Sequence, residues 1–251
     1  MRFLGTGTSN GNPEIGCRCE VCTSSDVRDW RFRSSVLVET EGKRILIDCS
    51  PDFRMQMLKT LETDYFTDLE GILLTHEHYD HVGGLDDLRI FCRKGALPVY
   101  AEDNVVKAIQ SRLSYVFKEH KYPGIPNLTL IPIKNQPFSV SGIEIIPIRL
   151  MHGNLPIFGY RIGNYAYLTD LKTIPEEEFE KLQDLDVLII NALRIKEHVA
   201  HQNLQQALHN IEKINPRQAY LTHVSHQFGL HSLMKQYLPE NIFIAYDGLV
   251  I

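Results

Sequence analysis

The sequence lacks a long apolar run and lacks an excess of basic residues. No uninterrupted apolar stretch among its 251 residues approaches the ~20 residues that a helix needs to cross a bilayer. The formal net charge is −5, whereas proteins that hold nucleic acid do so mainly through Lys and Arg. These absences disfavour a membrane-spanning protein, and nucleic acid is not the expected partner.

An apolar leader is also absent, and cysteine is scarce. The opening MRFLGTGTSNG reaches Gly and polar residues without the apolar core of a signal peptide. We therefore expect a cytoplasmic protein, whose thiols stay reduced. Five cysteines are present, and an odd number fits poorly with a complete disulfide framework.

Short apolar strands alternate with helical patterns, and no linker, repeat or charge block interrupts them. The pattern predicts one α/β domain over residues 1–251, with strands for two sheets and helices outside. Residues 114–127 are expected to end a helix and form a loop, either packed on the surface or covering a pocket. Strands are predicted at 34–40, 44–49, 70–75, 98–101, within 127–162, and at 165–170, 186–191, 218–223 and 241–247. Helices are predicted at 82–94, 103–113, 175–182, 204–214 and 229–238.

The segment LLTHEHYDHVGG gathers three histidines and an aspartate between a buried strand and a helix. A strand end is a rigid mount, and the loop beyond it can direct its side chains to one place. Imidazole and carboxylate groups suit Zn, Mn or Fe. The candidate metal ligands in this loop are His76, His78, Asp80 and His81.

One loop cannot surround two metal ions, and further candidate ligands follow other apolar runs. His152 ends IIPIRLMH, Asp170 ends YAYLTD, and His223 ends QAYLTH. If these strands are neighbours, the three side chains project from the same edge of a sheet.

The H-x-H-x-D-H run, followed by His, Asp and His, resembles the metallo-β-lactamase superfamily of metal hydrolases. The resemblance implies a four-layered αβ/βα sandwich with the site at the sheet edges. It further implies that His76, His78 and His152 hold one divalent ion, that Asp80, His81 and His223 hold another, and that Asp170 bridges both together with a water or hydroxide.

Three cysteines, Cys17, Cys19 and Cys22, occupy the stretch CRCEVC. A structural zinc ion takes four tetrahedral ligands, so this set needs one more. A redox-active cysteine set is the alternative interpretation. Cys49 and Cys92 fall in apolar patterns and are expected in the core.

Together with the opening GTGTSNGNP, the cysteines resemble the PhnP-type phosphodiesterases, which act on phosphoribosyl cyclic phosphate and carry a structural zinc. That resemblance gives His226, in THVSHQFG, as the fourth ligand. It also implies that a histidine in ALRIKEHVAHQNL assists the leaving group. His201 matches better than His198, and we assign it as general acid, paired with Asp80.

Three further residues could act near the site. Asp48 ends a predicted strand and is expected to orient the histidine loop by hydrogen bonds. Asp52 and Arg54 could touch a substrate phosphate or simply begin a solvated helix.

The leading hypothesis is a metal-dependent phosphodiesterase that hydrolyses a small or cyclic phosphodiester, with two active-site ions (Zn or Mn) and one structural Zn. A tRNA 3′-end endonuclease is an alternative, although no long basic arm is visible. Lactam or thioester hydrolysis and a PqqB-like accessory role are further alternatives. A homodimer is compatible with the sequence on general grounds.

Overall fold

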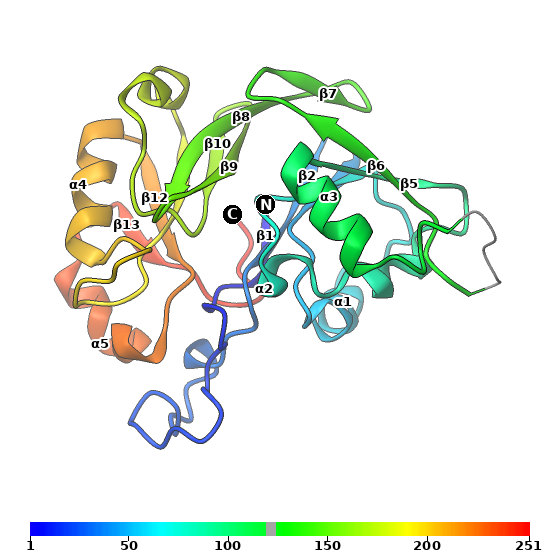
Figure 1. Cartoon of the computed structure of the whole chain (residues 1–251). Helices are drawn as coiled ribbons and strands as arrows, with labels where there is room; N and C mark the ends of the chain where they lie inside the picture. Colours follow the sequence, from blue (N-terminus) through cyan, green and yellow to red (C-terminus); the bar gives the residue numbers. More distant parts are fainter. Residues whose placement is uncertain (119–123) are drawn as a thin grey trace.

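The computed structural model describes residues 1–118 and 124–251 and contains two β-sheets packed face to face. One sheet has the strand order β1-β2-β3-β4-β5-β6, and the other has the order β13-β12-β11-β10-β9-β8-β7. In Figure 1, α1, α2 and α3 lie beside the first sheet and α4 and α5 beside the second. The predicted α/β sandwich of four layers is confirmed.

Each sheet combines antiparallel and parallel strands. The first is formed by β1 (Arg2–Gly5), β2 (Ser35–Thr40), β3 (Lys43–Ile47), β4 (Gly71–Leu73), β5 (Leu97–Glu102) and β6 (Leu128–Ile133). The second is formed by β7 (Phe138–Val140), β8 (Ile143–His152), β9 (Leu155–Ile162), β10 (Tyr165–Leu168), β11 (Val187–Asn191), β12 (Gln218–Thr222) and β13 (Ile242–Ile244).

Five α-helices and five 3₁₀ helices connect the strands in the described part of the chain. The α-helices are α1 (Phe53–Leu61), α2 (Tyr79–Val82), α3 (Asp103–Arg112), α4 (Leu204–Ile214) and α5 (His231–Met234). The 3₁₀ helices are η1 (Val27–Asp29), η2 (Leu85–Ile90), η3 (Glu176–Leu182), η4 (His226–Phe228) and η5 (Lys235–Tyr237).

The central strands are apolar on both faces, because each sheet packs against the other sheet on one face and against helices on the other. In β3, Ile45 and Ile47 face the other sheet, while Leu46 belongs to the core under the helices of its own side. Successive strand side chains point to opposite faces, so β3 reads as a continuous apolar run. Ile189 of β11 faces the inter-sheet core in the same way, and its neighbour Leu188 faces outward, toward the helix layer.

The predicted helix at 82–94 is replaced by two short helices, α2 and η2. The amide of Gly84 donates to Cys49 O at 2.9 Å, and the amide of Cys49 donates to His81 O at 2.7 Å. These bonds tie the histidine loop to the end of β3, so the chain turns there instead of continuing as one α-helix. The predicted helix at 175–182 is 3₁₀, and the one at 229–238 divides into α5 and η5.

The start of the chain lies against the segment that follows β12. The amide of Thr8 donates to Val224 O at 3.1 Å, and the amide of Val224 donates to Thr6 O at 3.0 Å. The segment that carries the three cysteines extends away from the two sheets, as the blue trace in Figure 1 shows. Part of the expected loop at 114–127 lies outside the described residues. No helix in the described ranges is long and apolar enough to cross a membrane.

The close approach at Gly84 gives a stability prediction. A Cβ there would lie 2.1 Å from Ser50 O, so Gly84→Ala forces the backbone apart. We expect a loss of ~3 kcal/mol in the free energy of unfolding. Gly163→Ala is the matched variant, because its φ of +56° is strained for alanine but its Cβ has open space; it should cost ~1 kcal/mol. Chemical denaturation measures both, and equal losses would contradict the steric argument.

Candidate functional site

Five polar segments meet where strands of both sheets end. Asp48 follows β3, the histidine loop follows β4, His152 ends β8, Asp170 follows β10, and His223 follows β12. Three of them share an unusual backbone: φ is +60° at Asp48, +58° at Asp170 and +53° at His223. Non-glycine residues in this left-handed region are uncommon and collect at functional sites.

Asp80, His81, Asp170 and His223 form one buried cluster, with ligand atoms all within 4.8 Å of one another. Nε2 of His81 lies 2.6 Å from Asp170 Oδ2 and 3.2 Å from Asp80 Oδ2. Nε2 of His223 lies 3.1 Å from Asp170 Oδ1 and 3.6 Å from Asp80 Oδ2. These four residues are those that the sequence placed at one of the two ion sites.

His76, His78 and His152 form an adjoining group of imidazoles. The ring centroid of His78 lies 4.6 Å from that of His76 and 5.2 Å from that of His152. Nδ1 of His152 lies 3.0 Å from Ala200 O. A carbonyl can only accept, so Nδ1 carries the proton and Nε2 is left with its lone pair for a ligand. A further set of close ligand atoms joins His152 to Asp170 and His201 within 4.8 Å.

The donor set fits metal ions. Buried polar atoms are normally hydrogen-bonded, because an unpaired one costs free energy. Although His81 Nε2 and Asp170 Oδ2 are close, neither makes a hydrogen bond of acceptable geometry. Other site atoms are also buried without a hydrogen-bond partner among the described residues: His76 Nε2, His201 Nδ1, and Nδ1 and Nε2 of His223. A bound cation would satisfy these converging nitrogen and carboxylate atoms, which lack hydrogen bonds.

Asp48 supports the histidine loop from behind. Its fully buried carboxylate lies 2.7 Å from His81 Nδ1, and it accepts from the amide and the hydroxyl of Thr75 at 2.9 Å. The bond to Nδ1 leaves His81 Nε2 facing the cluster. Asp48 therefore makes the hydrogen bonds that its predicted orienting role requires.

The electrostatics of the cluster favour cations. Burial would raise the pKa of Asp170, but His223 and His81 hold it well below its ordinary value. Burial would lower the pKa of His81, yet Asp80, Asp170 and Asp48 raise it well above the usual range. Burial, with the nearby His81, lowers the pKa of His76 well below the usual range, so that ring is neutral. The carboxylates of Asp80 and Asp170 thus favour a positive charge beside them, which His81 carries as a proton here and which a bound metal ion would supply in its place.

His201 stands at the rim of this cluster, in the loop between β11 and α4. Its Nδ1 lies 3.2 Å from Asp170 Oδ1, so its carboxylate neighbour is Asp170. The pairing of His201 with Asp80 suggested by the sequence has no counterpart among the contacts of the described residues. His198 stabilises the loop itself, because its Nδ1 accepts hydrogen bonds from the amides of Ala200 and His201 at 3.2 and 3.3 Å.

The three cysteines of the opening segment meet His226. Cys17, Cys19, Cys22 and His226 have ligand atoms all within 4.8 Å of one another, and we call them the cysteine–histidine cluster. Sγ of Cys17 and of Cys19 each lie 3.3 Å from His226 Nδ1. Burial opposes ionisation of Cys19, but the Cys22 amide and His226 outweigh it and lower its pKa to about 6. A thiolate is the form that binds metal.

The sequence reasoning missed one contact. Glu14 Oε2 lies 3.0 Å from His226 Nε2 and so orients the ring; its position shortly before the cysteines was the one available signal. Of the two alternatives for Asp52 and Arg54, the structure shows the helix start. Asp52 precedes α1 and accepts from Arg33 Nε at 2.8 Å, and Arg54, in the first turn of α1, contacts Met55 Sδ.

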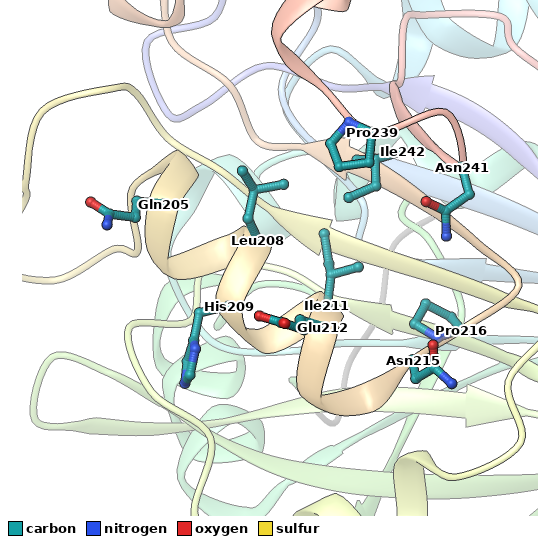
Figure 2. Close-up of a pocket in the computed structure, with 10 residues that line it drawn as sticks. All are labelled: Gln205, Leu208, His209, Ile211, Glu212, Asn215, Pro216, Pro239, Asn241 and Ile242. Carbon is teal, nitrogen blue, oxygen red and sulfur yellow. The ribbon is translucent and has the colours of Figure 1, made fainter.

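A cavity of about 580 Å³ lies elsewhere, beside the outer surface of α4. Figure 2 shows that it is lined by residues of α4, the turn after it and the segment before β13. None of the candidate metal ligands lines it, so it is separate from the histidine cluster.

Comparison with known proteins agrees with this geometry. Residues 43–224 match the model of the beta-lactamase superfamily domain. A crystal structure described as a new diphosphatase from the PhnP family superposes with a TM-score of 0.91 at 37% identity, covering 99% of this chain and 95% of that one. The Zn-bound PqqB from Methylobacterium extorquens superposes with a TM-score of 0.78 at 19% identity, covering 99% and 98%, which is a likeness of fold.

The fold and the clusters define a protein of the metallo-β-lactamase type, with side chains placed to bind metal ions. The chain belongs to the beta-lactamase superfamily and, within it, to the PhnP family. A curated relative from Porphyromonas gingivalis, named octanoyltransferase, is 51% identical over 250 residues, 98% of this chain but 50% of that protein. The chain spans about half the length of the curated relatives it matches first.

The bond between Asp48 and His81 gives a prediction about metal affinity. Asp48→Asn keeps the shape but removes the charge that fixes the His81 ring. We expect the Zn or Mn affinity of the His81 side of the site to fall by ~10–100-fold. Competition with a chromogenic chelator measures this affinity, with Asp52→Asn as the control away from the site. An unchanged affinity would show that Asp48 serves only the fold.

Removal of metal from the cysteine–histidine cluster gives a second prediction. A bound ion shields the thiolates, so a strong chelator should make Cys17, Cys19 and Cys22 react faster with a thiol reagent. Mass spectrometry of labelled peptides measures each thiol. Cys49 is the internal control, because it is fully buried and burial raises its pKa well above the usual range. Labelling that is equally fast before and after chelation would contradict a zinc ion at this cluster.

Proposed function

We propose that the chain is a phosphodiesterase that hydrolyses a small or cyclic phosphodiester at two divalent ions, Zn or Mn, with a separate structural zinc at the cysteine–histidine cluster. The observation that carries the proposal is the meeting of all seven candidate ligands and His201 at the strand ends. Membership of the PhnP family supports it. Residues 1–251 are proposed to act as one domain on a small-molecule substrate.

The ligands are proposed to divide as the resemblance implied. His76, His78 and His152 would hold one ion, Asp80, His81 and His223 the other, and Asp170 both. Such ions generate a nucleophile from water near neutral pH and neutralise charge on the phosphoryl oxygens. The chain itself holds the ligand rings in the required tautomers, through Asp48 at His81 and Ala200 O at His152.

His201 is proposed to donate a proton to the leaving oxygen. Burial and the neighbouring His223 and His152 outweigh Asp170 and lower its pKa to about 3, so the ring is neutral at pH 7 before substrate binds. An anionic phosphate beside the ring favours its protonated form. The proposed role therefore requires that the bound phosphodiester raise the pKa of His201 enough for the ring to carry the proton.

Hydrolysis of a diphosphate is a second candidate, because the PhnP-family structure at 37% identity is described as a diphosphatase. Its leaving group is a phosphate, which needs a proton less than an alkoxide does. This difference separates the two candidates, since only diester hydrolysis with a poor leaving group depends strongly on His201. Thioester hydrolysis releases a thiolate, which leaves without a proton, so His201 has no equivalent task in it. Lactam hydrolysis releases an amine nitrogen that must take up a proton, so it differs from the proposal in its substrate and not in its need for a proton donor.

The test uses Mn-loaded protein and two phosphodiesters, one with a 4-nitrophenyl leaving group and one with an alkyl leaving group. His201→Ala should lower turnover of the alkyl ester by ~10²-fold and that of the aryl ester less, because the aryl oxide leaves without a proton. His209→Ala, on the exposed side of α4, is the matched control.

Equal small losses on both esters would remove His201 from the leaving-group role. Turnover of an inorganic or organic diphosphate, with no turnover of either diester, would favour the second candidate. No hydrolysis of either class by protein with two bound ions would reject the proposed function and leave the accessory role.

A further inference from the structure

The loop that carries His201 lacks regular structure, and its backbone is held by side chains. From Ile195 to Ala200 the residues belong to no helix or strand. Five carbonyls of this stretch lie within hydrogen-bond distance of side-chain donors: Ile195 O of Asn203, Lys196 O and Glu197 O of Arg194, His198 O of Lys172, and Ala200 O of His152. The position of His201 therefore depends on which of these donors are present.

Arg194 makes the largest share of these contacts. Its Nε donates to Lys196 O at 3.2 Å, and its Nη2 donates to Glu197 O at 2.7 Å. The remaining fork nitrogen, Nη1, donates to Gln227 Oε1 at 2.8 Å. A planar guanidinium can hold three acceptors in fixed directions, whereas the single ammonium of lysine cannot.

Gln227 connects this loop to the cysteine–histidine cluster. It follows His226 directly in η4, and its amide lies 3.2 Å from Ser225 Oγ. Ser225 in turn donates from its amide and its hydroxyl to Leu193 O, each at 2.9 Å. The segment 225–227 is thus bonded to residues 193 and 194, immediately before the His201 loop begins.

We propose that Arg194 is a positioning residue that couples the cysteine–histidine cluster to the loop of His201. When the cluster closes on His226, the neighbouring Gln227 is held in place. The side chain of Gln227 orients the guanidinium of Arg194, and that guanidinium holds the backbone that leads to His201. This role rests on the proposed function, since it concerns the residue assigned to the leaving group. Arg194 acts through His201 and does not itself touch the metal ligands among the described contacts.

The first experiment measures the loop directly, by hydrogen exchange of the peptides that cover 194–203 in the metal-loaded protein. Arg194→Gln should exchange faster there, with zinc content unchanged. Gln227→Leu should produce the same change in smaller measure, and adding it to Arg194→Gln should change nothing further, because the two act in series. Arg217→Gln is the control, since its side chain is exposed and pairs with Asp186.

The second experiment measures turnover with the alkyl and aryl phosphodiesters. Arg194→Gln should lower kcat for the alkyl ester by ~10-fold and for the aryl ester by less, with KM within about twofold, because misplaced catalytic groups lose rate more than binding. Arg194→Lys should restore part of the loss.

The outcomes distinguish a failure of this coupling from a failure of the proposed phosphodiesterase function. Unchanged exchange at 194–203 in Arg194→Gln would overturn the coupling, and so would equal kcat losses on the two esters. If the wild-type protein hydrolyses no diester, the proposed function fails. Faster exchange at 194–203 in both single variants would then still support Arg194 as the link between cluster and loop.

Discussion

The buried carboxylate of Asp48 is the interaction on which the site depends. It accepts from Thr75 and His81, and so joins the end of β3 to the loop that follows β4. Because this carboxylate is buried away from solvent, Thr75 and His81 are its hydrogen-bond donors among the described residues, and the bonds fix these two residues in turn. The left-handed backbone at Asp48 turns its carboxylate toward that loop, and Asp170 and His223 have the same backbone at the ends of their own strands. Two sheets thereby place rigid strand ends around one space.

Much of this arrangement could be predicted from the sequence. The apolar runs of β3, β4, β10, β11 and β12 are strong signals, because strands covered on both faces lack polar interruption. Polar residues directly after such runs then had to gather at a sheet edge. The cysteine spacing likewise predicted a cluster that needs a fourth ligand. The fold class is confirmed, and the candidate ligands lie together, although their division between two ions stays a prediction.

Other features depended on long-range contacts that no local pattern reveals. The helix expected at 82–94 is divided because Gly84 bonds to Cys49, a contact that periodicity cannot show. The sequence could not decide whether Asp52 touches a phosphate or begins a helix, and the structure places it before α1 with Arg33 as its partner. The partner of His201 was taken as Asp80 and is Asp170, because the choice depends on how β10 sits beside the loop after β11. Arg194 had no recognisable signal, since its partners are backbone atoms and a residue far along the chain, and Glu14 had only its position shortly before the cysteines.

The spread of the candidate ligands along the chain has a consequence for biosynthesis. The histidine loop and the cysteines are synthesised long before His223 and His226. Neither cluster can close until those residues have left the ribosome. The earlier thiols and imidazoles therefore wait without their partners until then, and metal uptake accompanies formation of the second sheet.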